Sequence, residues 1–132
     1  MPYLNIDDGM DEHPKIESLS DAAFRMYVSA LLYAARRGTD GAVPRAKARR
    51  LSDTASDGGA SELVRAGVWH DLGEGCDDSR TCLPGRAGEY VIHDFLQWNH
   101  SAHWWAERRK KDAERQAEWR KKKGLPPKKR RK

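Results

Sequence analysis

The amino-acid sequence predicts an α+β fold that is followed by a basic helix. Three observations support this prediction. Between positions 20 and 37, apolar residues recur every three or four positions, as they do in a helix that packs on a core. Apolar stretches at 68–72 and 89–95 flank a glycine-rich loop, which is typical of a β-hairpin. Residues 101–123 contain no glycine or proline, so we expect one uninterrupted helix there.

Charged residues are distributed unevenly along the 132-residue chain, whose length suits one compact domain. The net charge is +5 overall. Residues 101–132 contain 14 Lys and Arg and 4 Asp and Glu, whereas residues 1–100 contain 11 and 16. We therefore expect an acidic domain over residues 1–99, a basic helix over 100–123 and a disordered cationic tail over 124–132. Nucleic acid is the first candidate partner of such a basic segment.

Composition and motifs exclude several classes of protein. Hydrophobic residues make up 38% of the chain, and no apolar run approaches the length of a membrane span, so we expect no membrane partner. The first residues lack the basic start and apolar stretch of a signal peptide, which predicts a cytoplasmic protein. Because the sequence has no glycine-rich phosphate loop, nucleophile elbow or HExxH motif, we expect no enzymatic activity.

An acidic cluster near the N-terminus is the candidate for metal-dependent catalysis. It comprises Asp7, Asp8, Asp11, Glu12 and His13, which could hold Mg²⁺ in a nuclease. These residues also lie in a predicted turn, where Asp is favoured because its side chain bonds to the nearby backbone. We prefer the turn interpretation.

The first third of the chain predicts a strand, a loop and a long helix. The apolar residues at positions 3–6 favour a short N-terminal strand, and residues 10–19 favour a loop. The helix begins after Ser20, a suitable N-cap, and ends before Gly38, which suits the left-handed residue that follows many helices. The helix positions that we expect to carry the core are Phe24, Tyr27, Val28, Leu31 and Ala35.

The elements that follow complete a recognisable order. A short strand at 42–43 precedes a helix from Pro44 to about Ser52, with the proline at its first position, and a second short helix from about 60 to 66. The hairpin described above comes next, and its long glycine-rich loop carries Cys76 and Cys82. This order is that of a winged helix-turn-helix, in which the hairpin forms the wing and its loop the wing tip.

Several short motifs strengthen this interpretation. They are Asp7-Asp8-Gly9, His13-Pro14-Lys15, Asp40-Gly41 before Val43-Pro44, Leu63-Val64 before Ala66-Gly67-Val68-Trp69, His93-Asp94-Phe95-Leu96-Gln97-Trp98-Asn99, Ala113-Glu114-Arg115-Gln116 and Trp119-Arg120. With them the sequence resembles the short winged-helix proteins of actinobacterial phages and prophages, which are described as replication-initiation or helix-turn-helix DNA-binding proteins. The resemblance implies a winged-helix fold and a role in phage DNA replication initiation or its regulation, in the cytoplasm or nucleoid of a bacterial host.

One helix departs from the pattern of that family. The helix predicted at 60–66, where a DNA-reading helix would lie, offers Ser61, Glu62 and Arg65 to solvent and is barely basic. This composition weighs against sequence-specific base reading by the helix. The cysteines of the wing tip, in contrast, fit relatives that have cysteine-bearing hairpins.

Predicted DNA contacts are Lys, Arg and Ser side chains that would meet phosphates, each cation releasing a counterion as it binds. In the helix pair they are Arg45, Lys47, Arg49, Arg50, Ser61 and Arg65, and in the wing Arg80 and Arg86. In the basic segment they are Arg108, Arg109, Lys110, Lys111, Arg115, Arg120, Lys121, Lys122, Lys123, Lys128, Lys129, Arg130, Arg131 and Lys132. Trp104, Trp105 and Trp119 could stack on unpaired bases, but we expect them to pack within the protein.

Four side chains in or beside the hairpin form a possible zinc site. Zinc prefers four nitrogen or sulfur ligands in a tetrahedron, and His70, Cys76, Cys82 and His93 supply that set. The spacing of the cysteines differs from the tight C-x2-C of a zinc knuckle. Two free thiols in a mobile loop, beside two ordinary strand histidines, are therefore the alternative.

Two other classes of function remain open. The acidic domain could dock on a replisome or host protein, as an inhibitor or loader, with the basic segment as its tether to DNA. The same fold also serves transcriptional repressors and recombination directionality factors. Charge reversal at Arg45, Lys47, Arg49 and Arg50 would distinguish the two classes. It would lower the affinity for DNA if the helix pair docks on DNA, and it would change that affinity little if the body docks on a protein.

Overall fold

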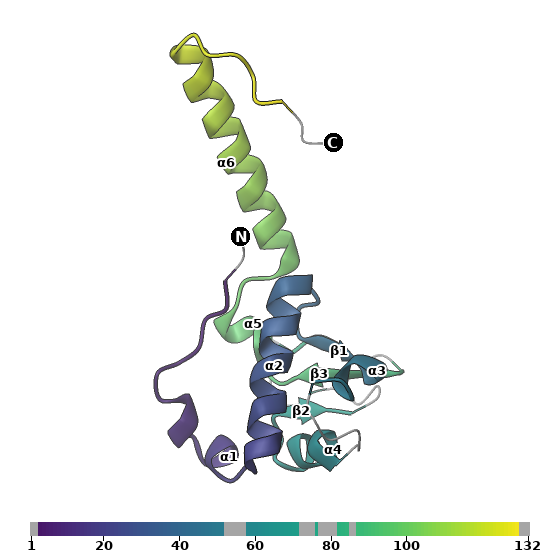
Figure 1. Ribbon diagram of the computed structural model, residues 1–132. Coiled ribbons are helices and arrows are strands. Elements are labelled where there is room, and N and C mark those ends of the chain that lie inside the picture. Colours follow the sequence, from purple (N-terminus) through teal and green to yellow (C-terminus); the bar gives the residue numbers. More distant parts are fainter. Residues whose placement is uncertain (1–2, 52–57, 72–75, 77–81, 85–86, 130–132) are drawn as a thin grey trace. The chain divides into compact units, whose positions relative to one another are not determined.

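The computed structural model describes residues 3–51, 58–71, 76, 82–84 and 87–129 (Figure 1). The chain divides into two compact units, Met1–Ser101 and Ala102–Lys132, which we call the body and the arm. No helix in the described part of the chain is long and apolar enough to cross a membrane.

The body is a mixed α+β unit, as predicted. Its strands form one antiparallel sheet in the order β1-β3-β2. In chain order its elements are the 3-10 helix η1 (Met10–Glu12), α1 (Pro14–Glu17), α2 (Asp21–Arg37), β1 (Ala42–Pro44), α3 (Arg45–Ala48), α4 (Gly58–Arg65), β2 (Trp69–His70), β3 (Glu89–Ile92) and α5 (Phe95–Trp98).

Helix α2 confirms the predicted long helix and both of its ends. The Ser20 side chain accepts a hydrogen bond from the Ala23 backbone at 3.2 Å, which satisfies one of the unpaired N–H groups of the first turn. Gly38 ends the helix with a φ of 64°. The helix carries the core as predicted: Leu31 is buried, and Phe24, Tyr27 and Ala35 are partly buried and pack against the core, whereas Val28 is only half-buried. The buried residues of α2 are Ala23, Met26, Ala30, Leu31 and Ala34.

Small residues allow α4 to pack closely on α2. A Cβ atom at Gly59 would lie 3.1 Å from the Met26 sulfur, which is tighter than an ordinary contact. One turn later Leu63 is fully buried in the core. The alanine-rich face of α2 is therefore the core face, because it admits a neighbouring helix that bulkier side chains would hold away.

The register of the sheet assigns its side chains to two faces. Trp69 pairs with Ile92 and Val43 with Tyr90, and all four side chains are buried in the main core with residues of α2. Because side chains alternate along a strand, the residues between them point to the opposite face.

That second face carries Val91, which pairs with Ala42 on one side and His70 on the other. His93 continues the alternation, since its backbone nitrogen donates to the Val68 carbonyl at 2.8 Å. Ala42 and Val91 are buried although they lie outside the main core cluster. The second face is therefore covered as well.

Several predicted boundaries are wrong. Positions 3–6 form no strand, and instead Asn5 donates hydrogen bonds to the Asn99 side chain at 2.8 Å and to the Trp98 carbonyl at 3.0 Å. The loop expected at 10–19 contains η1 and α1. Helix α3 starts one residue later than predicted, because Pro44 has the extended backbone of β1, and it is only four residues long.

The arm contains α6 (Ala102–Lys122), which confirms the predicted basic helix. Gly124, with a φ of 68°, follows the helix. The Arg120 guanidinium donates a hydrogen bond to the Pro126 carbonyl at 3.1 Å, so the chain turns back along the last turn of α6. Arg130, Arg131 and Lys132 lie outside the described residues.

Candidate metal centre and basic surfaces

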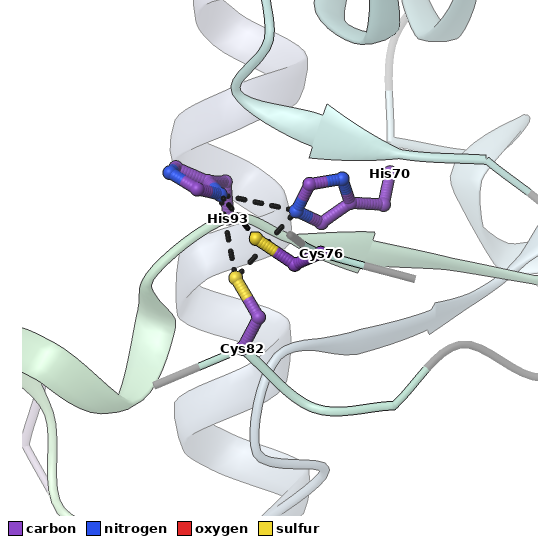
Figure 2. A group of neighbouring side chains, drawn as sticks. All are labelled: His70, Cys76, Cys82 and His93. Atoms are coloured by element: carbon purple, nitrogen blue, oxygen red, sulfur yellow. Dashed lines mark hydrogen bonds between the residues drawn. The ribbon is translucent and has the colours of Figure 1, made fainter. Parts of the chain in front are cut away.

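Four side chains from the hairpin gather on the second face of the sheet (Figure 2). His70 ends β2 and His93 follows β3, and the register places both on this face. Cys76 and Cys82 come from the segment between the two strands. They lie beside the two histidines.

The potential ligand atoms are spaced as metal binding requires. His93 Nδ1 lies 3.0 Å from His70 Nε2, 3.3 Å from Cys82 Sγ and 3.5 Å from Cys76 Sγ. Cys82 Sγ is also 3.5 Å from His70 Nε2, and all four atoms lie within 4.8 Å of one another. In a tetrahedral zinc site, ordinary bond lengths place ligand atoms about 3.3 to 3.8 Å apart. The separations of 3.0 to 3.5 Å are already close to these values, and pairs as far apart as 4.8 Å would have to close by about 1 Å to form one.

Asp94 contacts two of these four residues. Its carboxylate Oδ2 lies 3.1 Å from His93 Nε2, the ring nitrogen that faces away from the cluster. Its backbone N–H donates a hydrogen bond to Cys82 Sγ at 3.1 Å. The sequence analysis did not assign Asp94 to the metal site. Its position directly after the candidate ligand His93 is the signal that could have identified it as a supporting residue.

The thiol of Cys82 is held in its protonated form when no metal is bound. Burial raises its pKa to about 11, a rise that the hydrogen bond from the Asp94 backbone opposes and that Cys76 and the Asp94 carboxylate reinforce. A bound cation reverses this balance, because a coordinated thiol gives up its proton.

The arrangement can hold a metal ion such as zinc. It offers two imidazole nitrogens and two sulfurs, a complete set for four-coordinate zinc. A four-coordinate ion held by all four side chains would have no open position for a substrate or a water nucleophile. Closed coordination of this kind is typical of structural metal sites.

The predicted DNA contacts on α3 and α4 differ in exposure. The ammonium of Lys47 lies 5.4 Å above the Tyr33 ring, so this side chain packs partly on the body. Arg45 is half-buried, whereas Arg49, Arg50, Ser61 and Arg65 are exposed. Arg80 and Arg86 of the predicted wing lie outside the described residues.

The arm presents nearly all of its cations to solvent. No side chain of α6 is buried. Two ion pairs run along its surface, Arg115 with Asp112 at 2.8 Å and Lys122 with Glu118 at 3.8 Å. Among its described Lys and Arg residues, only Arg120 is half-buried, and the exposed ones are Arg108, Arg109, Lys110, Lys111, Arg115, Lys121, Lys122, Lys123, Lys128 and Lys129.

The tryptophans of the arm differ in their contacts and in their exposure. Trp104 contacts Trp105 edge to face, with ring centroids 4.9 Å apart, and lies 5.3 Å from the Arg108 guanidinium. Trp119 is 54% exposed, so the expectation that it packs within the protein is wrong.

The acidic N-terminal residues lie in a turn at Asp8 and Gly9 and in the 3-10 helix η1 that follows it, which contains Asp11 and Glu12. Asp7 Oδ1 accepts a hydrogen bond from the Gly9 backbone at 3.0 Å. His13 Nδ1 accepts one from the Lys15 backbone at 3.3 Å and caps α1. These side chains therefore bond to the nearby backbone, and Asp8, Asp11 and Glu12 are exposed.

Comparison with known proteins gives no relative of this chain: no family model, no curated protein and no solved structure matches it. The likeness to phage winged-helix proteins therefore stays a prediction.

Proposed function

We propose that this protein binds DNA, that the arm supplies most of the binding free energy, and that the body orients the complex. The observation that carries this proposal is α6 itself. Over 21 residues it buries no side chain, and all of its Lys and Arg residues except the half-buried Arg120 are exposed. A long, largely solvated cationic helix is suited to the phosphate backbone of a nucleic acid.

Internal ion pairing cannot neutralise the arm. Helix α6 has eight Lys and Arg and four Asp and Glu. Even if each acidic side chain paired with one cation, four cations of the helix would have no acidic partner within it. The exposed Lys123, Lys128 and Lys129 add to this excess. Such an excess attracts polyanions and makes their binding depend steeply on salt concentration.

A winged-helix arrangement would give the body its orienting role. In that arrangement α3 and α4 form the helix pair, and the exposed Arg49, Arg50, Ser61 and Arg65 would contact phosphates. These few contacts predict a modest contribution to affinity. Phage DNA replication initiation, or its regulation, is the setting that the sequence resemblance implies for this activity.

We further propose that the metal in the hairpin is zinc and that its role is structural. Two sulfur and two nitrogen donors favour zinc over magnesium or calcium, which prefer oxygen ligands. Bound zinc would clamp the segment that carries Cys76 and Cys82 onto the second face of the sheet. The body would thereby gain rigidity where its core is thin.

Protein docking is the second candidate function, and the acidity of the body favours it. Residues 1–100 contain 16 Asp and Glu against 11 Lys and Arg, so duplex DNA is repelled by most of this unit. Under this alternative the arm alone would hold DNA, and α3 would not contribute.

Fluorescence anisotropy of a labelled duplex, titrated with full-length protein at several salt concentrations, tests these proposals. Three double variants each remove two exposed positive charges, in the arm, in α3 and at a control site at the end of α2. They are R109Q/K110Q, R49Q/R50Q and R36Q/R37Q. Each lost phosphate contact should reduce the slope of log affinity against log salt by about 0.9.

We expect the arm variant to lose the most affinity and slope, the α3 variant to lose less, and the control to stay near wild type. An α3 variant identical to the control would favour protein docking. An arm variant identical to the control would contradict DNA binding by the arm.

A further inference from the structure

We infer that Asp94 is a positioning residue of the metal centre, which orients one ligand through its carboxylate and a second through its backbone. The inference rests on the proposed zinc site. Asp94 is the residue that immediately follows His93, and it contacts both His93 and Cys82. Contacts of this kind behind the ligands of a metal commonly fix their orientation and tune their donor strength.

The carboxylate determines which nitrogen of His93 is available. The ring directs Nδ1 toward the other three ligand atoms, at 3.0 to 3.5 Å. On the far side of the ring, Nε2 lies 3.1 Å from Asp94 Oδ2. A carboxylate accepts hydrogen bonds only, so this contact requires the ring proton to be on Nε2. The lone pair of Nδ1 is then free for the metal, and the negative charge makes the ring a stronger donor.

The backbone of the same residue holds the sulfur of Cys82. The N–H of Asp94 points at Cys82 Sγ from 3.1 Å, and it would stabilise the negative charge of a coordinated thiolate. The carboxylate Oδ1 lies 3.7 Å from the same sulfur and accepts the thiol proton when no metal is bound. Once the metal has displaced that proton, its positive charge offsets the repulsion between thiolate and carboxylate.

The backbone conformation explains how one residue can make both contacts. Asp94 has a φ of 56° and a ψ of 25°, which lie in the left-handed region that residues other than glycine rarely adopt. This turn ends β3 and starts α5. It brings the N–H toward Cys82 while the side chain reaches back to His93. Asp and Asn tolerate this conformation better than other non-glycine residues, which limits the substitutions that the position accepts.

Asp40 provides a matched control for the backbone effect. It has nearly the same φ angle, 58°, and lies in the turn between α2 and β1. Replacing either aspartate by alanine forces an unsuitable residue into the left-handed region. Only at Asp94 does the substitution also remove a carboxylate that contacts a metal ligand.

The experiment measures zinc affinity of full-length protein by competition with a chromophoric chelator, and the absorption spectrum of the cobalt-substituted protein. We expect Asp94→Ala to weaken zinc binding by about 10- to 100-fold and to shift the cobalt spectrum. Asp94→Asn should lose less zinc affinity, because its amide oxygen can still accept a hydrogen bond from Nε2–H and asparagine suits the turn. Asp40→Ala should stay within about twofold of wild type, whatever it costs in stability.

Three results would overturn the inference: zinc affinity within twofold of wild type for Asp94→Ala, an equal loss for Asp40→Ala, or an unchanged cobalt spectrum. If Asp94→Ala does not fold, the zinc affinity of Asp94→Asn tests the inference in its place. The nitrogen chemical shifts of His93 in that variant report which ring nitrogen carries the proton. Wild-type protein that binds no zinc would instead refute the zinc site itself, so the two failures are distinguishable.

Discussion

Glu62 of α4 accepts two hydrogen bonds from Ser20, the N-cap of α2, at 2.9 Å from the backbone nitrogen and 3.0 Å from Oγ. The same Ser20 oxygen accepts the bond that caps α2. This contact joins residues 42 positions apart and fixes α4 against the N-terminal end of the core helix. The carboxylate that made α4 look unsuited to DNA therefore has a structural role, and Ser61 and Arg65 remain as its exposed polar residues.

Glu62→Ala should lower the free energy of unfolding by about 1 kcal/mol, because it removes both hydrogen bonds to Ser20. Urea denaturation measures the change. Ser61→Ala, at an exposed neighbouring position, is the control and should stay within about 0.5 kcal/mol of wild type. A double-mutant cycle with Ser20→Ala should show that the two effects are not additive. Equal stability of Glu62→Ala and Ser61→Ala would contradict the contact.

Asn99→Ala should destabilise the body and release its N-terminal segment. Asn99 is only 8% exposed, and its side chain accepts the Asn5 backbone N–H at 2.8 Å. Its loss removes this hydrogen bond and leaves the N–H of the exposed Asn5 to water, at a cost of about 1 kcal/mol. Limited proteolysis should then cut near Asn5 sooner than in wild type. Gln97→Ala, an exposed substitution in the preceding helix α5, should leave the cleavage rate unchanged.

Removal of zinc should lower the melting temperature of the wild-type protein. A ligand at a hundredfold excess over its dissociation constant stabilises the folded state by about 2.7 kcal/mol, and a chelator abolishes this gain. The C76S/C82S variant lacks two of the four ligands, so its melting temperature should not respond to zinc or to chelator. A wild-type protein that is equally insensitive would argue for two ordinary free thiols.

Trp119 should report DNA binding by the arm. It is 54% exposed, and Trp98 of the body is 55% exposed, so the two indoles form a matched pair. If DNA lies along α6, its bases or backbone will change the environment of Trp119 and quench its fluorescence. Trp119→Phe should lose most of the DNA-induced quenching, whereas Trp98→Phe should retain it. The reverse pattern would place DNA on the body instead.

Local signals in the sequence predicted the elements that are stabilised locally. Ser20 and Gly38 bound α2 as predicted, because an N-cap side chain and a left-handed glycine act within one turn of the helix. The hairpin and the four metal-ligating residue types could also be identified, since both depend on residue type and spacing. Asp94, in contrast, acts through contacts that only the folded turn creates.

Features that depend on distant partners could not be predicted in this way. An apolar stretch near the N-terminus suggested a strand, but Asn5 bonds to Asn99, 94 positions away. The buried alanines of α2 were not predicted as core residues, because their burial depends on the close approach of α4, where Gly59 lies against Met26. The register of the sheet is equally non-local, and together with the hydrogen bond from His93 to Val68 it brings the two histidines to one face.

The salt dependence of duplex binding tests the central claim most directly. We predict that log affinity of the wild-type protein falls steeply with log salt, and that R109Q/K110Q reduces the slope by about 1.8, corresponding to two phosphate contacts. The R36Q/R37Q control should keep the wild-type slope. A flat wild-type slope, or equal slopes for the wild type and the arm variant, would contradict DNA binding by the arm.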